Sequence, residues 1–178
     1  IKLGANPDIT HVTGGIKFDA TESPGLEPRI LHARAITGER PVLIGASTHA
    51  TEEAALLLLL PALRHILPDV LLILAPRHTY RCDAVVQLCQ AAGEVVVKLS
   101  EVRAGNAVTT GSRVLLLDSM GELEAFYRVA RVAFVGGSLI PRGGHNLLEA
   151  VRAGSAVVMG PHLENIEDIA QQFIDLDA

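Results

Sequence analysis

The sequence predicts an α/β fold: a doubly wound, mostly parallel Rossmann-like sheet. Hydrophobic residues make up 49% of the 178 residues and aromatic residues only 3%, so the core must be aliphatic, as in sheets that helices cover on both faces. Continuous apolar runs, bounded by turn residues, recur at intervals that leave room for a helix. This pattern is typical of parallel strands joined by helical crossovers, and the length suits one domain.

Six strands are predicted from the apolar runs, at residues 42–46, 70–75, 95–99, 114–117, 132–136 and 156–159. Helices fill the gaps between them, at residues 51–66, 80–92, 121–130, 146–153 and from 165 onward. The stretch 100–113, between the third and fourth strands, is polar and rich in turn residues, which predicts a surface loop.

The first predicted helix carries signals at both its start and its interior. Glu52 and Glu53 stand in its opening turn, where carboxylates interact favourably with the helix dipole. Ser47 and Thr48 precede it as N-cap candidates. Pro61 lacks the N–H that an interior helical position needs, so we expect the helix to kink or restart there.

Composition argues against several classes of protein. The net charge is -5 and the basic residues are scattered, whereas nucleic-acid-binding domains concentrate Lys and Arg on one face. Cys82 and Cys89, the only cysteines, share one face of a predicted helix, where free Cys usually acts as a small buried hydrophobe. The His residues fall on separate loops without Cys partners, so no metal site is predicted. The most apolar run, 54–63, is shorter than the about 20 residues of a membrane span.

Polar motifs follow five of the six predicted strands: GASTH, PRH, DSMGE, GGSLIPRGGHN and GPHLEN, in chain order. The carboxyl ends of parallel strands meet at one edge of a sheet, and open α/β sheets bind their ligands there. Turn formation would explain the Gly and Ser in these loops, but not the repeated Arg and His. We therefore expect the five loops to form one ligand pocket.

The stretch FVGGSLIPRGGHNLLEA, residues 134–150, places its glycines directly before a predicted helix. Gly136, Gly137, Gly143 and Gly144 leave the backbone free of Cβ atoms where the N–H groups and the dipole of a helix attract an anion. This predicts a phosphate cradle, the alternative being that the glycines only allow a tight turn. The stretch is neither a nucleotide P-loop nor the dinucleotide fingerprint, because the residues that define those motifs are missing.

Other polar residues of these loops have two interpretations each. Arg77 can hold a phosphate or carboxylate bidentately, and His78 beside it is either a site residue or a hydrogen-bonded structural one. Met120 can flank a flat ring, while Glu122 near it suits a site or a helix start. Glu149 can accept two ribose hydroxyl hydrogens or simply be a solvated helix residue.

On these motifs the chain resembles the C-terminal, donor-binding domain of the 3-deoxy-D-manno-octulosonic acid (Kdo) transferase family. The resemblance covers nearly the whole chain, through VTGGIKFD, GASTHATEE, LLILAPRH, LLLDSMGELEAFYRVARVAFVGGSLIPRGGHNLLEA and VVMGPHLENIEDI. It implies the C-terminal half of a two-domain, B-type glycosyltransferase, whose Rossmann-like halves face each other across a cleft. The implied activity is transfer of Kdo from CMP-Kdo to the lipid A precursor in lipopolysaccharide biosynthesis, with no cofactor and no metal.

The roles of individual residues follow from the resemblance. Lys17, in GGIKFD, matches a lysine that stabilises charge in the transition state, whereas the general base lies on the N-terminal domain. The chain departs from the family at Gly15, where the family has Asn, and at Leu147, where it has Pro. The implied substrate-binding residues are Pro76, Arg77, His78, Met120, Gly121, Glu122, Gly136, Gly137, Gly143, Gly144, His145, Asn146, Leu147, Leu148 and Glu149.

The resemblance also implies a domain organisation. Residues 1–20 would be an interdomain strand or linker and residues 21–178 the nucleotide-sugar-binding domain, with the N-terminal acceptor domain and the last C-terminal helices absent. The parent protein is expected at the cytoplasmic face of the bacterial inner membrane, where its N-terminal domain meets the lipid A precursor, and this domain alone is expected to be soluble and inactive. Two alternatives stay open: a UDP-sugar-using glycosyltransferase or epimerase of the same fold, and a non-catalytic nucleotide-binding module.

Overall fold

The computed structural model describes residues 4, 6–11, 22–106, 108–109 and 111–176. Within these residues six strands form one sheet in the order β3-β4-β2-β1-β5-β6, and every neighbouring pair is parallel. The strands are β1 (Val42–Thr48), β2 (Leu71–Pro76), β3 (Val96–Lys98), β4 (Val114–Leu116), β5 (Val132–Val135) and β6 (Ala156–Val158). Each overlaps a predicted strand, so the prediction of a doubly wound parallel sheet is confirmed.

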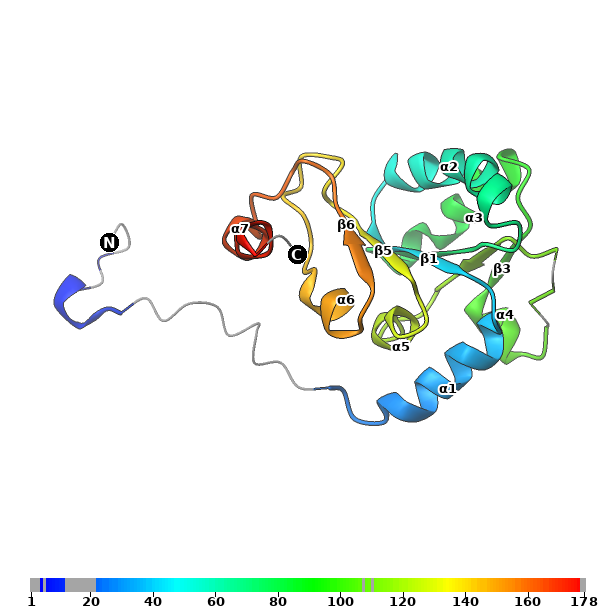
Figure 1. The fold of residues 1–178 in the computed structure, drawn as a ribbon, viewed down its shortest axis with the longest axis horizontal. Coiled ribbons are helices and arrows are strands. Elements are labelled where there is room, and N and C mark those ends of the chain that lie inside the picture. Colours follow the sequence, from blue (N-terminus) through cyan, green and yellow to red (C-terminus); the bar gives the residue numbers. More distant parts are fainter. Residues whose placement is uncertain (1–3, 5, 12–21, 107, 110, 177–178) are drawn as a thin grey trace.

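The strand order reverses between β1 and β5. From β1 the chain builds one side of the sheet with β2, β3 and β4, and it then crosses to the other side for β5 and β6 (Figure 1). The loops that leave the two central strands diverge at such a switch point and open a crevice. The loops after β1 and β5 therefore flank the expected position of a ligand.

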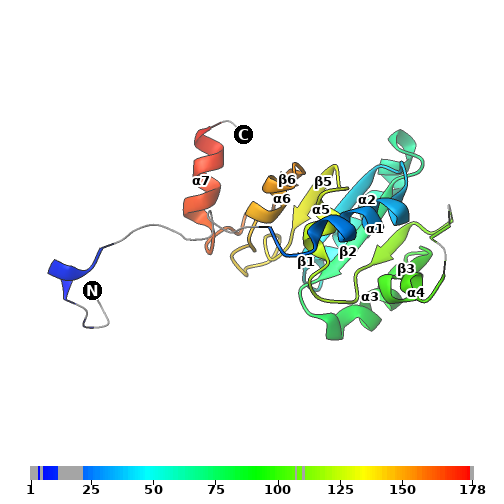
Figure 2. The same cartoon turned by 90° about the horizontal axis from the view of Figure 1, so that it is seen from below.

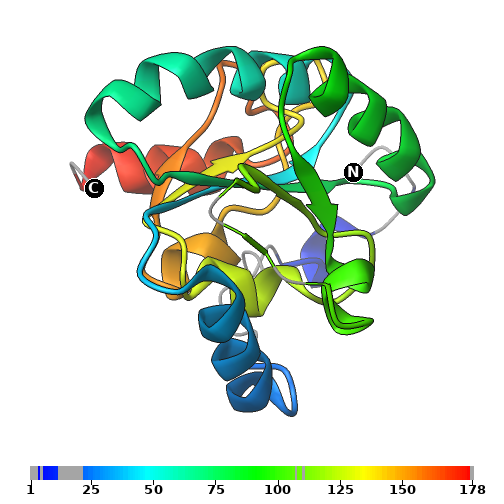
Figure 3. The same ribbon diagram turned by 90° about the vertical axis from the view of Figure 1, so that its right-hand side faces the viewer.

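Helices cover both faces of the sheet, in two layers that Figure 3 shows above and below it. Successive residues of a strand point to opposite faces, so Ile44 and Ala46 of β1 enter one core while Leu43 enters the other. One face carries α2 (Glu52–Ile66) and α3 (Cys82–Ala91). The other carries α1 (Leu26–Thr37), α4 (Leu99–Arg103), α5 (Leu123–Tyr127) and α6 (Leu148–Arg152).

The last helix, α7 (Glu167–Asp175), stands beyond β6 and α6, past the β6 edge of the sheet (Figure 2). Its partly buried Ile169 and Phe173 pack against a small cluster formed by Val135, Leu147, Leu148 and Ile166. Two single turns of 3-10 helix complete the described elements, η1 (Pro7–Ile9) and η3 (Thr79–Arg81).

Two helices were not predicted. Helix α1 buries few apolar side chains, Leu26, Ile30 and Ala33, which gave too weak a periodic signal. Helix α4 begins at Leu99 and ends at Arg103, so it occupies the first residues of the stretch 100–113 that was predicted to be a loop. Its Leu99 is fully buried, so packing stabilises a short helix in a polar sequence.

The start and the interior of α2 also differ from prediction. The helix runs as one element through Pro61 and does not restart there, because the buried Leu57 and Leu60 around it pack on the sheet and offset the lost hydrogen bond. Ser47 and Thr48 do not cap it, since both still belong to β1. The prediction for the cysteines is confirmed: Cys82 and Cys89 are free and buried on α3.

Residues 12–21 lie outside the described residues. Gly15, Lys17 and most of the predicted interdomain segment 1–20 therefore stay predictions of the sequence. In the described part of the chain, no helix combines the length and apolar character that crossing a membrane requires.

Candidate functional site

A cavity of about 110 Å³ lies at the carboxyl edge of the sheet, where three strand-end loops meet. The end of β1 contributes Ser47, the loop after β2 contributes Arg77, and the loop after β4 contributes Glu122. The predicted residues that line it are Pro76, Arg77, Met120, Gly121 and Glu122. The structure thus brings together side chains that were predicted from motifs far apart in the sequence.

The walls of this cavity are held by contacts with neighbouring elements. The Arg77 backbone N–H donates to the Thr48 carbonyl oxygen at 2.9 Å, which ties the β2 loop to β1. Glu122 forms an ion pair with Arg103 of α4 at 2.8 Å. Met120 is 72% exposed, so its thioether side chain is free to pack against a planar group.

Glu52, the first residue of α2, is fully buried and holds the glycine-rich loop after β5. One carboxylate oxygen accepts the N–H groups of Ser138 and Leu139, both at 3.1 Å. The other accepts those of Gly137 and His49, both at 2.9 Å. A buried charge is tolerated only when it is hydrogen-bonded in this way.

These hydrogen bonds overturn the simple form of the predicted phosphate cradle. The N–H of Gly137 points to Glu52, that of Gly136 donates to the Ala46 carbonyl oxygen at 2.8 Å, and that of Gly144 donates to the Gly137 carbonyl oxygen at 2.8 Å. These three groups are therefore engaged within the protein rather than aimed at an anion. The sequence could not show this, because the competing acceptor lies 85 residues away.

The structure gives a different reason for two of the glycines. A Cβ atom at Gly136 would lie 2.5 Å from the Ser47 carbonyl oxygen, so only glycine lets the β1 and β5 loops approach so closely. Gly137 has a φ of 70°, which L side chains rarely adopt, and it packs beneath the His145 ring. The alternative that the glycines serve the turn is thus the better account of these two.

Glu53, the second residue of α2, holds the loop after β2. It is fully buried and pairs with both terminal nitrogens of Arg81, at 2.6 and 3.2 Å. The Thr48 hydroxyl donates to the same carboxylate at 2.9 Å, and the hydrogen bond to Glu53 raises the pKa of Arg81. The two adjacent carboxylates therefore fasten the β1, β2 and β5 loops to the start of one helix.

Three histidines from these loops meet at the switch point. The Nε2 atoms of His49 and His145 are 2.8 Å apart, and their ring centroids are 5.1 Å apart with the ring planes at 23° to each other. The His78 ring stands edge-on to His49 at 6.3 Å and stacks on Tyr80 at 5.3 Å. Burial lowers the pKa of both His49 and His145, since an apolar surrounding disfavours the charged imidazolium.

The remaining predicted residues lie beside the cavity rather than in its wall. The Asn146 side-chain oxygen accepts the Leu148 N–H at 3.2 Å, so this residue helps to begin α6. Leu147 and Leu148 are buried in the core, which leaves only their backbone to contact a ligand. Glu149 is exposed in the first turn of α6, and Gly143 packs against Asn165 of the loop after β6.

Comparisons with known proteins point to one family. No protein-family model matches the chain. The 3-deoxy-D-manno-octulosonic acid transferase of Bordetella pertussis is 39% identical over 178 residues, which cover 97% of this chain and 40% of that protein. The transferase of the same name from Haemophilus influenzae is 35% identical over 175 residues, covering 98% of this chain and 40% of that protein.

A solved structure of nearly the same extent decides the family. The crystal structure of the C-terminal CMP-Kdo binding domain of WaaA from Acinetobacter baumannii matches with a TM-score of 0.77 and 35% sequence identity, covering 85% of this chain and 80% of that chain. This chain belongs to the 3-deoxy-D-manno-octulosonic acid transferase family. It spans about 40% of the length of the curated transferases it matches.

Sequence reasoning missed three residues that build the site of this Kdo transferase domain. Glu52 and Glu53 were interpreted only as first-turn carboxylates that suit the helix dipole, and His49 was not selected as a site residue. A signal was present in GASTHATEE, where a strand end, a histidine and two acids stand within a few residues. Only the fold reveals that the acids are buried.

The backbone on both sides of His49 adopts unusual conformations in this Kdo transferase domain. Ser47 has a φ of 51° and Thr51 a φ of 78°, and neither is glycine. The pairing of β1 with β2 shifts register between Ala46 and Thr48, where a bulge interrupts the ladder. Bulges and strained residues gather at functional sites, because the surrounding contacts must hold them there.

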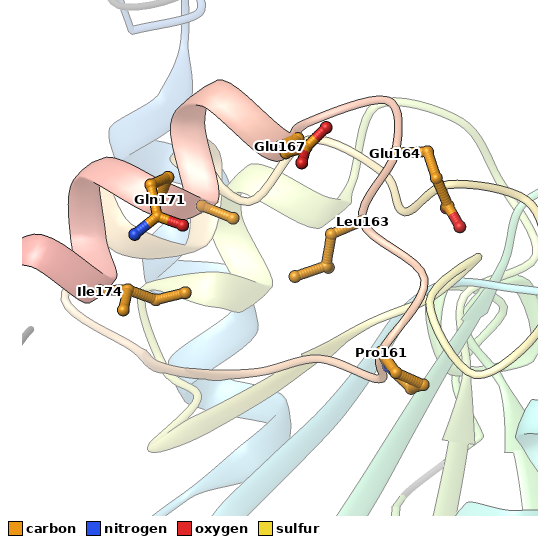
Figure 4. A pocket seen from close by; sticks show the side chains of 7 residues that line it. Pro161, Leu163, Glu164, Glu167, Gln171 and Ile174 are labelled. Carbon is orange, nitrogen blue, oxygen red and sulfur yellow. The ribbon is translucent and has the colours of Figure 1, made fainter.

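Two other cavities of the described part of this Kdo transferase domain contain none of the predicted site residues. One, of about 270 Å³, lies between α7 and the loop before it (Figure 4); Glu164 and Glu167 are its charged residues, which does not suit an anion. The other, of about 400 Å³, lies beside α2 and is apolar except for Arg131. Over the residues that the structure describes, no group of three or more His, Cys, Asp or Glu could hold a metal ion.

Proposed function

We propose that this chain binds CMP-Kdo, and that it forms the donor-binding part of a glycosyltransferase that moves Kdo to the lipid A precursor in lipopolysaccharide biosynthesis. The observation that carries the proposal is the cavity at the carboxyl edge, in a domain whose solved relative is titled a CMP-Kdo binding domain. Family members of this kind are named transferases. The rival UDP-sugar and non-catalytic interpretations have no comparable support.

The residues of the cavity suit a nucleoside monophosphate. The Arg77 guanidinium can pair with two phosphate oxygens at once. The exposed Met120 can pack on a base, and Glu122 can accept hydrogen bonds from it. Glu149, exposed in the first turn of α6, can accept hydrogen bonds from ribose hydroxyls, and Asn146 orders that turn.

Positive charge at this edge comes from side chains, which supports binding without a metal ion. Arg77 lines the cavity, and Arg142 and Arg81 lie near enough to lower the pKa of His49. A phosphate is thus compensated by arginines, as in many anion sites. We expect chelation of divalent ions to leave binding unchanged.

Catalysis belongs to the longer protein. Lys17, by its place in GGIKFD, is proposed to stabilise charge on the departing phosphate, and the general base is proposed to lie on the acceptor domain. The same domain would meet the lipid A precursor at the inner membrane. The 178 residues alone are expected to bind the donor without transferring its sugar.

Thermal unfolding of the chain with CMP tests the proposal. A ligand at ten times its dissociation constant adds about 1.4 kcal/mol, which raises the melting temperature of a domain of this size by about 3–6 °C. Arg77→Ala should lose most of this shift. Arg34→Ala, an exposed arginine on α1, is the matched control and should keep it.

Nucleotide choice separates the alternatives. We expect CMP to stabilise the chain more than UMP or UDP does, because the donor is proposed to carry cytidine. A larger shift with UDP would favour the UDP-sugar interpretation. No shift with any nucleotide at millimolar concentration would refute the proposed function.

A further inference from the structure

The contact between His49 and His145 restricts the charge that the two rings can carry. A neutral imidazole has one N–H and one lone pair, so at an Nε2–Nε2 distance of 2.8 Å one ring donates to the other. Two imidazolium rings would set two hydrogens against each other at this distance. The pair can therefore be neutral or carry one extra proton, but it cannot carry two in this geometry.

Arginines and a third histidine, from several elements, face the pair. Arg142 of the loop after β5 and Arg81 of η3 act on His49. Arg77 of the loop after β2 acts on His145, and His78 of the same loop acts on both rings. Together with burial, these groups favour the neutral pair in the free protein.

The negative group that faces both rings is Glu52 of α2. Its two oxygens already accept four backbone N–H groups, so it is committed to holding the loop. An anion placed beside Arg77 would add the missing negative charge. It would also favour an extra proton on the rings, because a nearby opposite charge stabilises the charged form.

We infer that His49 and His145 form an anion subsite that takes up one proton from solvent when the phosphate of a nucleoside monophosphate binds. The inference rests on the proposed function and adds to it how the phosphate is met. The N–H groups of Gly136, Gly137 and Gly144 are engaged elsewhere, so these three groups are not available for this contact. The position agrees, since the two rings come from the loops on either side of the switch point.

Isothermal titration of the 178-residue chain with CMP measures the proton directly. Titrations at pH 6.5 in two buffers of different ionisation enthalpy give the number of protons taken up. Cytidine, which lacks the phosphate, is the matched ligand and should cause no uptake. The phosphate of CMP itself titrates near pH 6, so each variant is compared with the wild-type protein at the same pH.

His49→Gln and His145→Gln each replace a ring that can take up a proton by an amide that cannot, while hydrogen-bonding groups are kept. His32→Gln, on the exposed face of α1, is the control. A site whose pKa rises on binding adds affinity as the pH falls through the bound-state pKa. The affinity of wild type relative to either Gln variant should thus increase from pH 8.5 to pH 6.0, by about tenfold for each pKa unit that binding adds. The control should follow the wild type.

A lysine at position 145 carries a positive charge at every pH of the experiment, so it tests whether charge alone restores CMP binding. His145→Lys should recover CMP affinity relative to His145→Gln, without the dependence on pH. The melting temperatures of the unliganded variants show whether each variant is folded. If one of the two Gln variants does not fold, the other still tests the inference.

The outcomes separate the two proposals. If CMP binds, but wild type and Gln variants take up the same number of protons and differ by a constant factor at all pH values, the inference is wrong and the proposed function stands. A Lys variant that binds as weakly as the Gln variant also overturns the inference. If CMP does not bind the wild type at any pH, both fail.

Discussion

Replacing Glu52 by Gln should destabilise the protein strongly, although it changes a carboxylate to an amide of the same size. Each carboxylate oxygen accepts two N–H groups, at 2.9 to 3.1 Å. Whichever oxygen becomes the NH₂ group, two N–H groups lose their acceptor and face another donor. Each such loss costs about 1–3 kcal/mol, so we expect the free energy of unfolding to fall by about 4 kcal/mol.

Urea denaturation followed by circular dichroism measures this change. A loss of about 4 kcal/mol corresponds to a fall of about 8–16 °C in melting temperature for a domain of 150–250 residues. The matched control is Glu27→Gln, an exposed acid in the first turn of α1, which should change stability by less than about 0.5 kcal/mol. If Glu52→Gln were as stable as the control, the buried carboxylate would not be holding the β5 loop, and the reasoning would be refuted.

Three further predictions concern a backbone strain, the cysteines and metal dependence. Thr51→Gly should raise the free energy of unfolding by about 1 kcal/mol, because it relieves a φ of 78°; a lower urea midpoint would contradict this. Burial raises the pKa of Cys89 to about 11 and raises that of Cys82, so a thiol reagent at pH 8 should label neither until denaturant is added, and rapid labelling of the native protein would contradict it. Excess EDTA should leave the CMP-induced rise in melting temperature unchanged, whereas its loss would indicate a required metal ion.

The strands could be predicted closely because their signal is local. A parallel strand that is buried on both faces needs an unbroken apolar run, and residues 71–76 are such a run with every side chain buried. Helix α1 gave no comparable signal, since it buries few apolar residues. Its stability comes from packing against α5, which the local sequence does not reveal.

The site was predictable in its position but not in its internal contacts. Arg77 and Glu122 were placed at one edge by topology alone, and they do line one cavity. The role of Glu52 depends on N–H groups 85 to 87 residues further along the chain. The pairing of His49 with His145 spans 96 residues. Nothing in the sequence of either loop indicates that the two histidines meet.

The position of Glu52 and Glu53 at the start of α2 has a consequence for how the protein loses its function on heating. The acids that begin a major helix of the core also hold the loops after β2 and β5, so these loops should stay in place for as long as α2 is folded. Nucleotide affinity should persist almost unchanged up to the cooperative transition and then vanish with it. A bound nucleotide can accordingly serve as a reporter of the folded fraction.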